Sequence, residues 1–480
     1  MAHIDITHPE HAINGKKWFG HPAGLYILFF TELWERFSYY GMRAILVLFM
    51  VDSVGKGGLG WSNEQALALY GWYTMLVYLM SVPGGILADK GLGQKKTVLL
   101  GGLLLVAGHS VLAIPTLWAF YLGLALIVLG VGGLKANIST MVGGLYRPGD
   151  PMRDKGFTIF YIGINIGAFT SSLLVAWVAQ QYGWHYGFGL AGIGMLLGQI
   201  VYMIGQKYLK GVGDYSDGKF TSEDGTKRDR PLTKVEKDRV VVLVISFLIV
   251  IVFWGAFEQA GGLMNLYAQQ KVDRLLEAFN YTVPAPWFQA ANPFFIIIFG
   301  TLVASFWYRR RMRGKEESSI FKMAIGTMIM GAGFYFMTAA AMQAQNTPDG
   351  KAAMYWLIFA YLFHTIGELS VSPVALSYIT KLAPVKYASI MMGVYFAATG
   401  LGNKVAGLLG EAAQDAGELQ IFTGIATFCI LFGLLILVFL KKLKALSHGA
   451  EEMEDPLKED MMEDEGYSRD DRAQVSRKKR

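Results

Sequence analysis

The stretch ELWERFSYYGMR at residues 32–43 lies inside an apolar run over residues 24–51, which is long enough to cross a bilayer. On a helical wheel, its charged and phenolic side chains share an arc of roughly 140°. They are Glu32, Glu35, Arg36, Tyr39, Tyr40 and Arg43. Charges inside a membrane are costly and usually face a water-filled pathway or a proton relay. The stretch therefore predicts a membrane helix with one functional face, and an internally paired structural cluster is the alternative.

The composition agrees with a membrane protein. Of 480 residues, 53% are hydrophobic and 17% are charged, whereas soluble domains carry about 25% charged residues. The formal net charge of +6 comes from basic residues placed between the apolar runs. We therefore expect a lipid bilayer around the chain and no nucleic-acid partner.

Apolar runs of membrane-spanning length occur twelve times. They cover residues 24–51, 64–88, 97–115, 117–142, 156–181, 185–208, 240–267, 286–308, 320–342, 353–380, 387–412 and 418–440. We therefore expect an all-α membrane protein with about twelve transmembrane helices. A polar segment after the sixth run splits the chain into six plus six, which is typical of transporters that rock two halves around a midplane site.

Every second connection between the runs is basic, and the intervening connections hold few Lys or Arg residues. By the positive-inside rule, both termini are predicted to be cytoplasmic. The expected organisation is an N-terminal six-helix bundle at 1–208, a cytoplasmic linker at 209–239, a C-terminal six-helix bundle at 240–446 and a charged cytoplasmic tail at 447–480.

Other polar side chains recur at membrane depth, and each needs a partner in a medium of low dielectric. They are Lys135, Tyr161, Asn165, Trp254, Glu258, Asn292, His364 and Glu368. His109 is better explained as a packing histidine, and Lys404 and Glu411 as residues that extend to the membrane surface. Metal-ligand clusters, phosphate loops and nucleophile elbows do not stand out, so we expect no cofactor, no metal and no enzymatic activity.

Three ordered blocks resemble one family. Residues 32–43 resemble the ExxER helix of the proton-dependent oligopeptide transporters, the POT or PTR family. The blocks GGILADKGLG at 84–93 and FYIGINIG at 160–167 resemble the same family's helix 2–3 loop and helix 5. The resemblance implies the major facilitator fold, a bacterial inner-membrane location and proton-coupled symport of di- and tripeptides.

The resemblance also implies roles for single residues. Arg36, Arg43 and Lys135 would meet the carboxylate of the peptide. Asn165, Asn292 and Glu368 would meet its amino group. Tyr39, Tyr40, Tyr73 and Trp254 would line side-chain pockets, and Tyr161 and Glu258 are further substrate-binding candidates.

We expect Glu32, Glu35, Arg36 and Glu258 to couple proton binding to transport. Two carboxylates beside one arginine form a cluster whose preferred charge changes when a peptide carboxylate arrives. Two gating ion pairs between the halves are also predicted, Arg43 with Glu258 and Lys135 with Glu368.

The chain departs from the family pattern at two positions and leaves alternatives open. Phe257 precedes Glu258 where a second acid is frequent, and Tyr395 stands where tryptophan is expected. The short, polar 209–239 segment predicts the plain twelve-helix form. Alternative functions are proton-coupled transport of another small solute, such as nitrate, and peptide sensing without transport. The expected partners are peptide, protons and lipid, with a monomeric chain.

Overall fold

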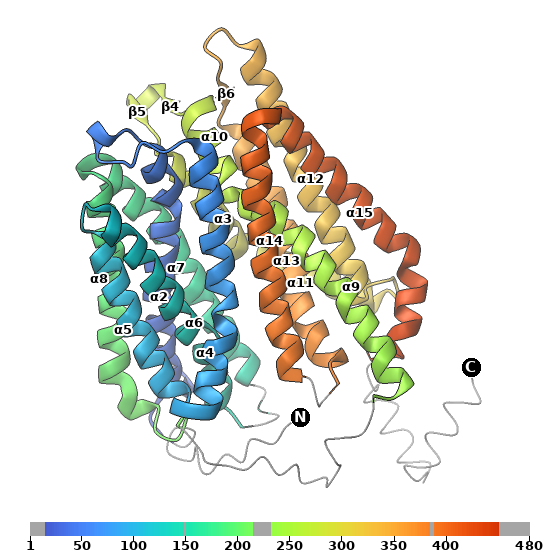
Figure 1. The fold of residues 1–480 in the computed structure, drawn as a ribbon. Coiled ribbons are helices and arrows are strands. Elements are labelled where there is room, and N and C mark those ends of the chain that lie inside the picture. Colours follow the sequence, from blue (N-terminus) through green and yellow to red (C-terminus); the bar gives the residue numbers. More distant parts are fainter. Residues whose placement is uncertain (1–14, 148–149, 151, 215–231, 385–387, 451–480) are drawn as a thin grey trace, which may run out of the picture.

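The structure is a computed structural model that describes residues 15–147, 150, 152–214, 232–384 and 388–450. Long helices run side by side through the molecule, so the predicted all-α fold is confirmed (Figure 1). The described strands are all two residues long. They pair as β1 (Lys17–Trp18) with β2 (His21–Pro22), β3 (Val272–Asp273) with β6 (Ala352–Ala353), and β4 (Leu275–Leu276) with β5 (Tyr281–Thr282).

The N-terminal helices form the first group. They are α2 (Ala23–Val51), α3 (Asn63–Leu79), α4 (Ser81–Leu87), α5 (Gln94–Leu112), α6 (Leu117–Gly144), α7 (Met152–Tyr182) and α8 (Trp184–Gly205). Short helical turns accompany them at η1 (Val54–Lys56), η2 (Ala88–Leu92) and η3 (Gln206–Tyr208). α2 packs mainly on α7 and α8, and α5 packs on α6 and α8.

The C-terminal helices form the second group. They are α9 (Lys234–Phe257), α10 (Leu263–Lys271), α11 (Ala291–Met312), α12 (Ser319–Asn346), α13 (Tyr355–Leu382), α14 (Ala388–Ala416) and α15 (Glu418–Ser447). Short turns lie at η4 (Glu258–Ala260), η5 (Glu277–Phe279) and η6 (Ala285–Ala290). α12 packs on α13 and α15, and α9 packs on α14.

All twelve predicted spans are helical, but two of them are interrupted. Residues 64–88 divide between α3, α4 and η2, and residues 240–267 divide between α9, η4 and α10. Within the described residues, ten segments are long and apolar enough to cross a membrane. The other two spans are α2 and α14, and α2 contains four charged residues. The chain is thus a multi-pass membrane protein of about twelve spanning helices.

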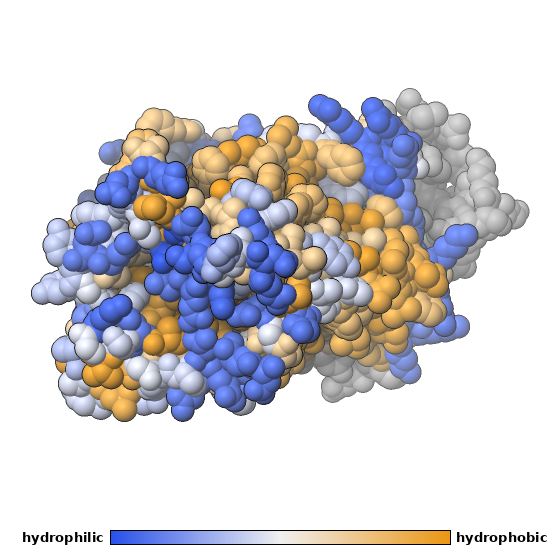
Figure 2. All heavy atoms as spheres, turned by 90° about the horizontal axis from the view of Figure 1, so that it is seen from above, coloured by the Kyte–Doolittle hydropathy of each residue, from blue (hydrophilic) through white to orange (hydrophobic). Residues whose placement is uncertain are grey.

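The outer surface of the helices is apolar, as contact with lipid requires. On α15, Leu431 is 60% exposed and Val438 is 77% exposed, although both are large aliphatic residues. Figure 2 looks onto one end of the molecule, where hydrophilic residues gather, while hydrophobic residues cover much of the flank. A soluble protein rarely exposes apolar surface over so much of its side.

The two groups of helices meet along α3 and α14, α2 and α10, and α7 with α11 and η6. Gly71 and Gly407 allow α3 and α14 to approach closely, because a Cβ atom added to Gly71 would lie 2.9 Å from the Cα of Gly407. Toward the end where α9 begins and α15 ends, these two helices slope away from the N-terminal helices (Figure 1). We call that end the basic end, since α11 and α15 finish there in Arg and Lys residues. The opposite end, where α2 ends and α3 begins, is called the outer end.

Parts of the predicted organisation fall outside the described residues. Residues 215–231 of the expected linker and 451–480 of the expected tail are not described. The four-part division of the chain, and the absence of extra helices between the bundles, therefore stay predictions.

Candidate functional site

The charged face of α2 is buried. The Nε atom of Arg36 lies 2.9 Å from Glu32 Oε1 and 2.5 Å from Glu35 Oε2. The three residues are at most 4% exposed. Their spacing of three and four positions brings both carboxylates to one guanidinium. Two acids facing one arginine leave an excess negative charge in a place where charge is costly.

Aromatic rings surround the arginines of this face. The Arg36 guanidinium lies 5.7 Å from the ring centre of Tyr39 and 5.9 Å from that of Tyr40. The Arg43 guanidinium lies 5.4 Å from the ring of Tyr40. Such cation–π contacts help a desolvated cation and leave its hydrogen-bond donors free for an anion.

Lys135 on α6 supplies a third cation to the same region. Its Nζ lies 3.4 Å from the centre of the Tyr78 ring. It interacts electrostatically with both Glu32 and Glu35. Together with Arg36, Lys135 balances the two carboxylates, so the cluster holds two acids and two bases.

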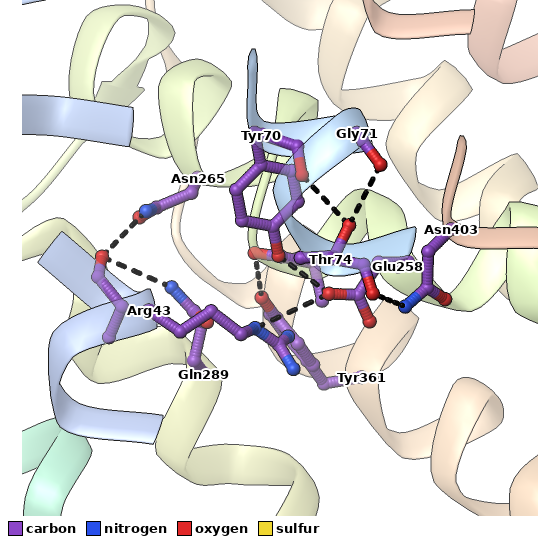
Figure 3. A network of polar contacts seen from close by, with 11 residues as sticks. Arg43, Tyr70, Gly71, Thr74, Glu258, Asn265, Gln289, Tyr361 and Asn403 are labelled. Atoms are coloured by element: carbon purple, nitrogen blue, oxygen red, sulfur yellow. Dashed lines mark hydrogen bonds and ion pairs between the residues drawn. The ribbon is translucent and has the colours of Figure 1, made fainter. Parts of the chain in front are cut away.

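A second cluster joins the two groups of helices (Figure 3). Arg43 Nε lies 3.4 Å from Glu258 Oε1, so the predicted ion pair is present. The hydroxyl of Tyr70 on α3 donates to the same oxygen at 2.6 Å. Glu258 follows the last residue of α9, where the helix tightens into η4. Nearby Gly261 has no room for a side chain, because an added Cβ would lie 1.9 Å from the Tyr70 hydroxyl oxygen.

Backbone acceptors carry further contacts between the groups. The carbonyl of Ala44 accepts from Asn265 Nδ2 at 2.8 Å and from Gln289 Nε2 at 3.5 Å (Figure 3). Trp287 Nε1 on η6 donates to the carbonyl of Leu173 on α7 at 3.0 Å. These three bonds add to the contact between the two groups of helices.

The outer end holds another polar contact. Asn63, the first residue of α3, exchanges hydrogen bonds with Gln270 on α10 at 3.4 and 3.2 Å. It also donates to Gln414 on α14 at 3.1 Å. Asn63 thus links both C-terminal helices that approach α3 at this end.

The anionic side of the site is on α13. Glu368 Oε2 accepts from Asn292 Nδ2 at 2.7 Å, and the same amide group lies 3.1 Å from Thr365 Oγ1. Among the described residues no ion pair joins Glu368 to Lys135, because each is engaged with a different neighbour. The predicted Lys135–Glu368 ion pair is therefore absent from this state of the protein.

The remaining predicted residues lie around these clusters. Asn165 is buried and donates to the carbonyl of Tyr161, one turn earlier on α7, at 2.9 Å. Tyr161 is 43% exposed and interacts electrostatically with Glu368 across the interface. Tyr73 is buried, and its hydroxyl has no hydrogen-bond partner in the described part of the chain. Trp254 is half-buried and packs edge-on against Phe257.

Two site residues are absent from the sequence-based prediction. Tyr70 bonds Glu258 and Tyr78 faces Lys135, but only Tyr73 of this helix is predicted. At 100° per residue the three tyrosines fall within an arc of roughly 140°. The helical-wheel analysis that identified the polar face of α2 could therefore have identified this face of α3 as well.

Comparison with known proteins identifies the class. The sequence profile of the POT family matches residues 95–224 and 230–422. The peptide transporter YePEPT of Yersinia enterocolitica subsp. palearctica serotype O:3 (strain YE-P4) is 37% identical over 83% of this chain and 89% of its own length. The di-/tripeptide transporter of Lactococcus lactis subsp. cremoris is 33% identical over 90% and 97%.

A solved structure is similar over nearly the whole chain. It is a mutant of peptide transporter POT in complex with alafosfalin, 34% identical, with a TM-score of 0.84 over 92% of this chain and 99% of that one. The chain therefore belongs to the POT family, as its three sequence blocks predict. Its relatives are transporters and not enzymes.

Proposed function

We propose that the chain is a proton-coupled symporter that imports di- and tripeptides by alternating access. The observation that carries this proposal is the separation of charge across the interface. Arg36, Arg43 and Lys135 belong to the N-terminal helices, and Glu368, bonded by Asn292, belongs to the C-terminal helices. A zwitterionic peptide needs a cationic and an anionic pole, and charge-assisted hydrogen bonds at both ends give affinity independent of its side chains.

The family relationship supports peptide over other cargo. By their names, the relatives above are a peptide transporter and a di-/tripeptide transporter, and a similar structure is a complex with alafosfalin. A lone anion such as nitrate has no amino group and would not use Glu368. A peptide sensor would bind the same ligand but would not accumulate it, and this difference can be measured.

In the proposed complex, the peptide carboxylate binds Arg36, Arg43 and Lys135. The amino group binds Glu368, Asn292 and Asn165. Aromatic residues on both sides of the interface provide adaptable walls for the peptide side chains. They are Tyr39, Tyr40, Tyr73, Tyr161 and Trp254.

Proton coupling follows from a count of charges. Glu32, Glu35, Arg36 and Lys135 sum to zero when all are ionised. A peptide carboxylate that binds the cationic side chains adds one negative charge to this buried cluster. Uptake of one proton by Glu32 or Glu35 restores neutrality, which a medium of low dielectric strongly favours. The charge of Glu258 is matched by Arg43, and we propose that this ion pair links the change in protonation to the interface between the two groups of helices.

We assign the Arg43–Glu258 ion pair to a gate at the outer end. The hydrogen bond from Tyr70 to Glu258, the bond from Asn265 to the Ala44 carbonyl and the Asn63 contacts support a state that is closed there. Opening toward the basic end would release the cargo on that side. When the molecule closes there, Lys135 and Glu368 are expected to form the second ion pair.

The orientation that we propose places the basic end in the cytoplasm. Arg309, Arg310 and Arg311 end α11, and Lys444 lies in the last turn of α15, in agreement with the positive-inside rule. Both termini would then be cytoplasmic, in the inner membrane of a bacterium. We further propose two six-helix halves joined by the 209–239 segment, and a functional monomer.

The decisive experiment is uptake of labelled dialanine into proteoliposomes with an inward proton gradient and a negative-inside potential. We expect accumulation that an uncoupler abolishes. Saturable dialanine binding without accumulation would favour a sensor. Uptake of nitrate in place of peptide, in tight liposomes, would favour the alternative cargo.

A further inference from the structure

A hollow of about 310 Å³ lies on α11 at the basic end, apart from the sites described above. Its lining combines two apolar with four cationic side chains. They are Leu302, Phe306, Arg309, Arg310, Arg313 and Lys315, and Ser305 completes the lining. Such a lining suits a ligand that is both apolar and anionic.

The acids of the neighbouring loop do not neutralise these cations. Glu316 accepts a hydrogen bond from Lys444 on α15 at 2.6 Å. Glu317 is paired with Lys322 and lies 3.4 Å from Arg311. Both carboxylates are therefore already matched by cations outside the hollow.

The cations of the hollow itself are exposed and hold spare donors. Within the described part of the chain, Arg309, Arg313 and Lys315 form no ion pair, and all three are exposed. Arg310 is fixed by a hydrogen bond of 2.6 Å from its Nε to the carbonyl of Glu316. The hollow thus has an unbalanced positive charge with one arginine held in place.

The apolar side of the hollow faces the surroundings of the bundle. Leu302 is 59% exposed and Phe306 is 57% exposed, and they lie one turn apart on α11. Only 22% of the most apolar window of this span is buried inside the protein. A chain of methylene groups lying along this face would cover both side chains.

We propose that this hollow binds an anionic phospholipid, such as phosphatidylglycerol. The lipid phosphate binds Arg309, Arg313 and Lys315, and an acyl chain lies along Leu302 and Phe306. Arginine forks match phosphate oxygens, and basic pockets at the membrane surface bind acidic headgroups. With the orientation proposed above, the lipid belongs to the cytoplasmic leaflet. The inference does not depend on which solute is transported.

A general attraction between basic ends and acidic membranes is the competing explanation, and a matched pair of variants separates the two. The double variant Arg309→Gln/Arg313→Gln removes two charges from the hollow. The double variant Lys441→Gln/Lys442→Gln removes two exposed charges from α15, also at the basic end of the molecule. If the attraction is general, lipid binding should weaken equally in both variants. If the hollow is a specific site, lipid binding should weaken only in the arginine variant.

The measurement is the rise in melting temperature of the full-length protein in detergent micelles during titration with phosphatidylglycerol, with phosphatidylcholine as the comparison lipid. We expect the arginine variant to bind phosphatidylglycerol roughly thirtyfold more weakly, from about 1 kcal/mol per basic residue. The lysine variant should keep the wild-type affinity. Equal weakening in both variants, or an unchanged arginine variant, would overturn the proposal.

Two further experiments serve as controls for this measurement. Inorganic phosphate at the same concentration should give no comparable rise, and an equal rise would show an anion site that needs no lipid. Native mass spectrometry should count fewer bound phosphatidylglycerol molecules on the arginine variant than on the lysine variant. Equal numbers on both would contradict the proposal even if the melting curves were altered by misfolding.

Discussion

The guanidinium of Arg43 and the carboxylate of Glu258 lie 3.4 Å apart, and both residues are less than 10% exposed. One comes from α2 and the other from the turn after α9, so the ion pair joins the two groups of helices. Removing either partner would leave the other charge buried and unpaired, at a cost of about 3–5 kcal/mol. The contact therefore has a large effect on which end of the molecule stays closed.

Substitution Tyr70→Phe tests the neutral member of this contact. It removes the hydrogen bond to Glu258, which is worth about 1.5–3 kcal/mol because the acceptor is charged. We expect the outer end to open more often, with a larger distance between spin labels at Lys56→Cys and Lys351→Cys. Replacing buried Cys429 by serine makes the labelling specific.

Tyr267→Phe is the control for this substitution. Its buried hydroxyl has no hydrogen-bond partner among the described residues. The spin-label distances should stay at their wild-type values. An equal widening in both variants would argue that loss of any buried hydroxyl loosens the protein.

Substitutions Glu32→Gln and Glu35→Gln test proton coupling. A proton moving down 100 mV contributes about 2.3 kcal/mol, enough for roughly fiftyfold accumulation of a neutral peptide. In a variant that has lost its coupling proton, this accumulation should fall to about onefold, while exchange of labelled for unlabelled peptide continues. Normal uphill uptake in both variants would contradict the proposed charge count.

Glu368→Gln tests the amino-group pole. The wild type should prefer dialanine over N-acetyl-dialanine, because the acetylated peptide has no ammonium group to pair with Glu368. In the variant this preference should shrink by roughly tenfold or more, as expected for a lost charge-assisted contact of about 1.5–3 kcal/mol. Competition against labelled dialanine measures both affinities. An unchanged preference would move the amino-group site away from α13.

Gly71→Ala tests the close approach of α3 and α14. An added methyl group would lie 2.9 Å from the Cα of Gly407, so one backbone has to move. We expect a cost of about 1–3 kcal/mol to the state closed at the outer end. The same spin labels report the change as a longer distance.

Gly85→Ala on α4 provides the matched control. An alanine at this helical position meets no atom within 4 Å, so it makes the same change in helix propensity without a clash. Its distances should match the wild type. If Gly71→Ala gives the same distances as this control, the close contact of the two glycines is not needed for the state closed at the outer end.

The loop after α11 predicts a pH dependence of stability. Partial burial alone would raise the pKa of Glu316, but hydrogen bonds from Lys444 and Ser318 lower it to about 2. A depressed pKa stabilises the folded state above the ordinary value of 4.5, and this contribution is lost as the pH falls from 4.5 toward 2. The melting temperature of Glu316→Gln should therefore lie below that of the wild type at pH 6 and approach it near pH 3. A gap that is constant with pH would exclude ionisation as its cause.

The sequence predicts the spans well because each one carries its own signal, a run of apolar residues of sufficient length. It also predicts that the polar face of α2 is internally paired or functional, since Glu32, Glu35 and Arg36 are neighbours on one helix. The structure shows the pairing directly. Local periodicity is enough for such contacts because they do not depend on how helices are arranged.

Contacts between distant helices are predicted less completely. The break after Phe257 is not marked by proline, and the packing of Gly261 against Tyr70 joins residues that are far apart in the sequence. The Lys135–Glu368 ion pair is absent from this state for a different reason. A transporter has more than one arrangement of its halves, and a single sequence predicts contacts from all of them at once, whereas one structure contains the contacts of one state.

The bonds to Ala44 have a consequence for how this interface can change during evolution. Asn265 and Gln289 donate to a backbone carbonyl, which every residue at position 44 would provide. Mutational drift on α2 can therefore alter the side chain at this position without deleting the acceptor. The donors are side chains, so mutations that remove these hydrogen bonds should occur at Asn265 and Gln289, among the C-terminal helices. Sequence variation should accordingly be unequal on the two sides of one contact.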